Sequence, residues 1–151
     1  MAISQSITTS FKTDILSGGM NFNTTNRSLT TNTQDKFVIA LYTTSATLGP
    51  TTTAYTATDE VPTATGYTAL GKTLTISQVP TSTGTTAFLD FDDISWTSSS
   101  FSADGALIYN ASNSNKSILV LNFGGTKTVT SGTFTIQFPT ADSSSAIIRI
   151  A

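Results

Sequence analysis

The chain has no cysteine and no histidine among its 151 residues. Without cysteine it has no disulfide, no thiolate metal site and no thiol nucleophile. Without histidine it lacks the commonest general base, the commonest metal ligand and the centre of every Ser-His-Asp triad. Glu60 is the sole glutamate, which weakens the case for the paired carboxylates of glycoside hydrolysis. We therefore expect no enzymatic activity and no cofactor.

Charged residues are also scarce, with seven basic and nine acidic side chains and a net charge of -2. Proteins bind nucleic acid and anionic membranes through basic patches, so neither is an expected partner of this chain. The first ten residues, MAISQSITTS, have neither the basic start nor the apolar core of a secretory signal. No apolar run is long enough to cross a membrane. We expect synthesis in the cytoplasm.

Serine and threonine are abundant, and apolar residues are spread evenly between them. This texture is typical of short, half-buried strands joined by polar turns, so an all-β fold is expected. One short helix is predicted over Ser10–Ser17, with Ser10 as its cap, an apolar face of Phe11, Ile15 and Leu16, and a stop at Gly18. The turn-rich segment that follows, up to residue 33, is either an extended arm or a surface loop.

Strands are predicted from Lys36 onward. Lys36–Thr43 (KFVIALYT) is apolar on both faces, so it should lie at the centre of a sheet or between two layers. In Thr86–Thr97 the apolar residues change parity, and a bulge at Asp92 and Asp93 would explain the slip. The other predicted strands are Tyr67–Ile76, Gly105–Asn110, Lys116–Phe123, Thr133–Pro139 and Ala146–Ile150.

Seven or eight short strands with turn signals between them indicate an antiparallel β-sandwich of immunoglobulin-like or jelly-roll type. Residues 1–35 would then form the N-terminal helix and arm, and residues 36–151 the sandwich domain. The order of the strands does not follow from these patterns.

The stretch GYTALGKT, residues 66–73, has the spacing of a nucleotide-binding P-loop. A P-loop needs an apolar parallel strand before the glycines and a helix that begins at the lysine. Residues 59–65 contain a proline and no apolar run, and Leu74–Ile76 alternates like a strand. We therefore expect no phosphate site.

The only local concentration of charge is the acidic cluster of Asp90, Asp92 and Asp93. Asp90 and Asp92 would project from the same face of a strand, with a spacing that a calcium site can use. The alternative is a solvated edge or bulge, where carboxylates discourage pairing between sheets. We favour the edge and predict no metal site, with these three residues as the calcium candidates.

Four aromatic residues carry polar tips and have the chemistry of a sugar-binding platform. They are Tyr55, Tyr67, Trp96 and Tyr109. In a small sandwich such residues more often belong to the core and its rim, and that is the interpretation we favour.

Four blocks of the sequence, in order and covering most of the chain, resemble a family of small tailed-bacteriophage virion structural proteins. They are FKTDILSGGMNF (11–22), KFVIALYTTSATLGPTTTAYTATDEVPTATGYTALGKTLT (36–75), LDFDDISWTSSSFSADGALIYN (89–110) and LNFGGTKTVTSGTFTIQFP (121–139). The blocks with rare residues, Trp96 and Gly105–Asn110, are the most specific. Leu70 departs from the pattern, since a second glycine is expected there.

The resemblance implies a part of a phage particle, made in the host bacterial cytoplasm, and not an enzyme. We expect a capsid decoration or cement protein on the virion surface, bridging subunits of the major capsid protein and itself a homo-oligomer, with a trimer favoured. The alternatives are a tail, baseplate or neck component, and a carbohydrate-binding module of a receptor-binding fibre. The candidate interface residues belong to the N-terminal segment: Phe11, Ile15, Leu16, Met20 and Phe22.

Overall fold

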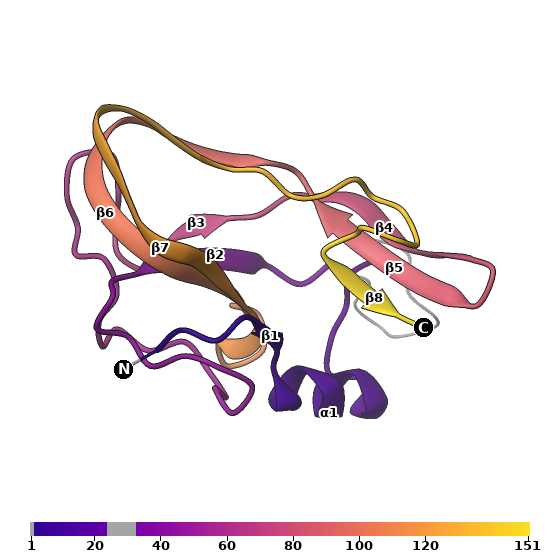
Figure 1. Ribbon diagram of the computed structural model, residues 1–151. Coiled ribbons are helices and arrows are strands. Elements are labelled where there is room, and N and C mark those ends of the chain that lie inside the picture. Colours follow the sequence, from indigo (N-terminus) through magenta and orange to yellow (C-terminus); the bar gives the residue numbers. More distant parts are fainter. Residues whose placement is uncertain (1, 24–32) are drawn as a thin grey trace.

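The computed structural model describes residues 2–23 and 33–151 and shows two antiparallel sheets with one short helix (Figure 1). The elements in chain order are β1 (Ser6–Ile7), α1 (Thr9–Ser17), β2 (Phe37–Tyr42), β3 (Lys72–Thr73), β4 (Ile76–Thr83), β5 (Thr86–Phe91), β6 (Ile94–Asn110), β7 (Lys116–Ile136) and β8 (Ile148–Ile150). The larger sheet has the order β1-β7-β6-β2-β3 and the smaller one β4-β5-β8. The predicted all-β sandwich with an N-terminal helix is confirmed.

Strand β2 is the most deeply buried element, and all six of its residues are buried. It lies between β6 and the short β3. Its alternate side chains enter two separate apolar clusters because successive residues of a strand point to opposite faces. The first cluster takes Phe37, Ile39 and Leu41, and the second takes Val38, Ala40 and Tyr42. The prediction of a strand that is apolar on both faces is confirmed.

Strands β6 and β7 form one long antiparallel hairpin of 17 and 21 residues, which replaces several of the short strands predicted here. Ile94 pairs with Ile136 at one end and Asn110 with Lys116 at the other. The register shifts between these pairs, and Ser98 and Ser131 have positive φ angles. Such bulges bend a strand without ending it, so polar residues that resembled turns lie inside the curved hairpin of Figure 1.

The predicted strand Thr86–Thr97 is two strands in different sheets. The chain leaves β5 of the smaller sheet at Phe91 and enters β6 of the larger sheet at Ile94. Asp92 and Asp93 form the connection, so the change of parity marks a change of sheet and not a bulge. Of the predicted strand Tyr67–Ile76, only β3 and the first residue of β4 pair in a ladder.

The N-terminal segment packs onto the larger sheet, where β1 pairs with β7. Thr8 caps α1 by accepting a hydrogen bond from the Phe11 backbone N–H, so the predicted cap, Ser10, lies inside the helix. Gly18 ends the helix in the left-handed conformation, as predicted. The arm or loop predicted after the helix falls mainly on residues 24–32, which lie outside the described part of the chain.

Candidate docking surface

The P-loop-like stretch ends in a strand. Lys72 lies in β3, and its Nζ donates a hydrogen bond of 2.6 Å to the Ser95 carbonyl and lies 6.0 Å from the centroid of the Trp96 ring. Gly71 has φ of +77° and packs so tightly that an added Cβ would lie 2.0 Å from the Ile39 carbonyl oxygen. The glycine and the lysine are therefore used to fit this loop against β2 and β6, and no helix begins at the lysine.

The three aspartates of the acidic cluster have different environments. Asp90 is buried, and its Oδ1 accepts a hydrogen bond from the Phe91 N–H at 2.8 Å while its Oδ2 has no partner in the described chain. Asp93 accepts a hydrogen bond from the Phe138 N–H, and Asp92 is exposed. Burial raises the pKa of Asp90. Within residues 2–23 and 33–151, no group of three acidic side chains is arranged to hold a metal ion.

The proposed sugar platform does not exist as a surface. Tyr67, Trp96 and Tyr109 are each at most 5% exposed, and Tyr55 is half-buried against Tyr109. Tyr67 and Trp96 pack on one another, with ring centroids 6.2 Å apart, inside the main core. The interpretation that the sequence favoured, core and rim, is confirmed.

Glu60 is the centre of a buried polar network that sequence reasoning missed. Its Oε2 accepts a hydrogen bond from the Tyr55 hydroxyl at 2.5 Å. Its Oε1 accepts from the Tyr67 hydroxyl at 2.7 Å and from the Leu70 N–H at 2.8 Å. Burial is the main reason that the pKa values of Tyr55 and Tyr67 are raised. The network holds the long connection between β2 and β3 in place. In the sequence, the only indication of it is a single glutamate in a segment that also contains tyrosines.

The five candidate interface residues divide between the core and the surface. Phe11 and Phe22 are buried and pack edge to face, with ring centroids 6.0 Å apart. Ile15 and Met20 are partly buried against the same core. Leu16 alone is presented to solvent, with 90% of its surface exposed. The phenylalanines therefore hold the N-terminal segment to its own domain, and only one face of α1 is free to meet another protein.

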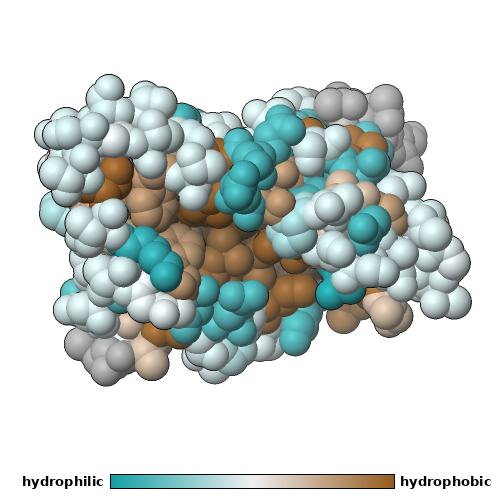
Figure 2. All heavy atoms as spheres, turned by 45° about the horizontal axis from the view of Figure 1, so that its top comes forward, coloured by the Kyte–Doolittle hydropathy of each residue, from teal (hydrophilic) through white to brown (hydrophobic). Residues whose placement is uncertain are grey.

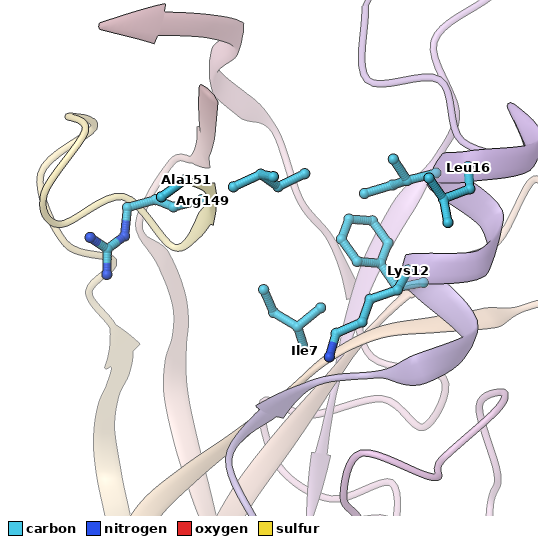
Figure 3. A pocket seen from close by; sticks show the side chains of 8 residues that line it. Ile7, Lys12, Leu16, Arg149 and Ala151 are labelled. Atoms are coloured by element: carbon cyan, nitrogen blue, oxygen red, sulfur yellow. The ribbon is translucent and has the colours of Figure 1, made fainter. Parts of the chain in front are cut away.

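An apolar groove runs between α1 and β8, and we call it the α1–β8 groove (Figure 3). Its first hollow has a volume of about 430 Å³ and its second, farther toward β5, about 200 Å³. The two hollows share Phe11, Ile15 and Ile150. Leu16 on α1 and Ile150 on β8, which is 53% exposed, form opposite walls. The groove is therefore an apolar surface that the described chain leaves open.

Two basic residues also line the groove. Lys12 extends from α1 toward Ile7, whereas Arg149 projects from β8 away from the hollow (Figure 3). Lys12 makes no side-chain hydrogen bond or ion pair with the described residues, and Arg149 donates to the carbonyls of Ser143 and Ser144. No aspartate or glutamate lines either hollow. Lys12 is therefore the basic side chain that faces the groove without a partner among the described residues.

Apolar atoms are also concentrated on the face shown in Figure 2, in a hollow between two more polar lobes. A separate hollow of about 440 Å³ is lined by Phe123, Phe134, Ile136 and Lys127 from β7. Phe134 in this hollow is only 9% exposed, and its ring packs in the core in tilted or edge-to-face contacts with its aromatic neighbours. The α1–β8 groove differs because a large apolar side chain, Leu16, stands almost wholly in water.

No protein-family model, curated protein or solved structure matches this chain. In the described residues, the only helix is α1, which is far too short to cross a membrane.

Proposed function

We propose that this chain is a non-enzymatic structural protein of a tailed-bacteriophage particle, a capsid decoration protein that bridges subunits of the major capsid protein. The proposal starts from the four sequence blocks that resemble such proteins and cover most of the chain. It places the protein on the outer surface of the virion after synthesis in the bacterial cytoplasm. A homo-oligomer, with a trimer favoured, is part of the proposal.

The structural observation that supports this role most strongly is the α1–β8 groove. Leu16 and Ile150 are exposed across an apolar cleft on a domain whose other apolar residues are mostly buried. Burying such a surface against another protein gains about 25 cal/mol per Å² before the costs of association are subtracted. A modest contact of this kind is sufficient when many copies bind one shell, because each oligomer then engages several sites at once.

The number of copies in purified virions tests this role. A decoration protein is present in many copies, comparable to the major capsid protein, and a stained gel of purified particles measures the ratio directly. A few copies per particle would instead indicate a tail, baseplate or neck component. Absence from the particle would reject a virion role altogether. The carbohydrate-binding alternative has no support from the aromatic residues, because the platform that it needs is buried.

A further inference from the structure

The α1–β8 groove extends over two hollows that share part of their lining. Its two adjoining hollows share Phe11 and Ile15 as a floor, and Ile150 stands between them on the opposite wall. Phe11 is 1% exposed and caps the domain core. The floor therefore belongs to the folded core, whereas the side chains of the walls are available to contact a bound segment.

The walls are apolar on both sides. Isolated exposed hydrophobic residues are ordinary on protein surfaces, but an apolar patch with polar surroundings marks an interaction site. Leu16 and Ile150 are two of the four large hydrophobic residues exposed on the described chain, the others being Leu70 and Val79. These two line the same hollow from different elements, so they form one patch.

The charge at the groove is opposite to that of the chain. The protein carries a net charge of -2, yet the charged side chain that faces the groove is the ammonium of Lys12, since Arg149 projects away from the hollow. Complementary charge on a partner speeds association and selects orientation. A partner segment with apolar side chains and a neighbouring carboxylate would complement both the apolar walls and the unpaired ammonium of Lys12.

We infer that the α1–β8 groove binds an apolar segment of the major capsid protein that carries aspartate or glutamate beside its apolar side chains. The inference rests on the proposed function and adds the surface and the chemistry of the partner. Leu16 and Ile150 bury the apolar side chains, and Lys12 pairs with a carboxylate at the rim.

The test is a binding titration of the purified protein on capsids assembled without it, with bound copies measured after sedimentation. Leu16→Asp puts a carboxylate on the apolar wall and should weaken binding by about ten-fold or more, which corresponds to about 1.4 kcal/mol. Lys12→Glu should weaken binding several-fold, with a loss that shrinks as salt concentration rises. Thermal unfolding of both variants should match that of the wild type, because both side chains face solvent.

The matched control is Leu70→Asp, which places the same change on an exposed leucine outside the groove. It should bind like the wild type. If the wild type binds and the two groove variants bind equally well, the inference is wrong while the proposed function stands. Equal weakening by Leu70→Asp and Leu16→Asp would also reject the groove as the site. If the wild type does not bind these capsids at all, the proposed function and the inference both fail.

Discussion

Both carboxylate oxygens of Glu60 accept hydrogen bonds from described residues. The surface between α1 and the smaller sheet differs, because it leaves large apolar side chains uncovered. Glu60 accepts three hydrogen bonds. At the α1–β8 groove, by contrast, the large apolar side chain of Leu16 stands in water. Stable domains satisfy buried polar atoms and cover apolar ones. The Glu60 network is satisfied within the described residues, and the apolar walls of the groove are the surface that association would cover.

The largest contrast is expected from the same truncation at two leucines. Leu107 is fully buried in β6, so Leu107→Ala should lower the free energy of unfolding by about 3–5 kcal/mol. Leu16→Ala should change it by less than about 0.5 kcal/mol, since none of the described residues covers that side chain. Urea denaturation of both variants measures the two values. Similar losses at the two sites would contradict the claim that α1 presents an uncovered leucine.

A slightly smaller loss is expected when the Glu60 network is removed. Glu60→Ala leaves the Tyr55 and Tyr67 hydroxyls and the Leu70 N–H without an acceptor. Because each buried donor left unpaired costs about 1–3 kcal/mol, we expect a loss of about 3 kcal/mol or more in urea denaturation. Glu60→Gln is the control, because it keeps an acceptor oxygen and should lose markedly less. Equal losses for the two variants would mean that keeping the side-chain volume and one acceptor oxygen restores nothing, which would contradict the role assigned to these hydrogen bonds.

In the smaller sheet, replacing Asp90, which is buried in β5, should stabilise the protein. Burial raises the pKa of Asp90, so its charged form destabilises the fold above that pKa, and the penalty disappears as the pH falls toward the unfolded value of about 3.9. Asp90→Asn removes the charge and keeps an acceptor for the Phe91 N–H. We expect the free energy of unfolding to rise by about 1 kcal/mol at pH 7.

A series of urea midpoints at different pH values checks this expectation. The gain of the Asp90→Asn variant over the wild type should shrink as the pH falls below the folded pKa of Asp90. A variant that is less stable than the wild type at pH 7, or a gain that does not change with pH, would show that the unpaired oxygen carries no penalty.

The smallest effect is expected at Lys72. Lys72→Ala removes one hydrogen bond to Ser95 and a contact with the Trp96 ring at the surface, so the loss of stability should be about 0.5–1 kcal/mol. No ATP binding is expected in either protein, because the lysine lies in a strand. Measurable ATP affinity in the wild type that disappears in the variant would overturn the assignment of residues 66–73.

The sequence predicts β2 to within one residue at each end, because its residues are apolar on both faces and a short run of this kind is typical of a central strand. It fails for β6 and β7, since glycine and serine mark both turns and bulges. The change of parity at Asp92 and Asp93 is likewise shared by a bulge and by a change of sheet. A bulge and a change of sheet differ in which distant strand the residues pair with. A single sequence does not show that pairing.

The candidate site is predicted in part. The sequence points to the N-terminal helix and to Leu16, but it groups Leu16 with Phe11 and Phe22, which the fold buries. Spacing along a helix indicates which side chains share a face, not which face the rest of the chain covers. The opposite wall, with Arg149 and Ile150, comes from residues more than 130 positions away. Its approach to α1 depends on tertiary structure alone.

A cryo-electron microscopy reconstruction of the intact particle tests the central claim most directly. The account predicts density for this two-sheet domain repeated across the outer shell, with α1 and β8 turned toward the capsid and a capsid segment lying between Leu16 and Ile150. Density for the domain confined to the tail axis or baseplate, or a shell position with the α1–β8 groove facing solvent, would contradict it.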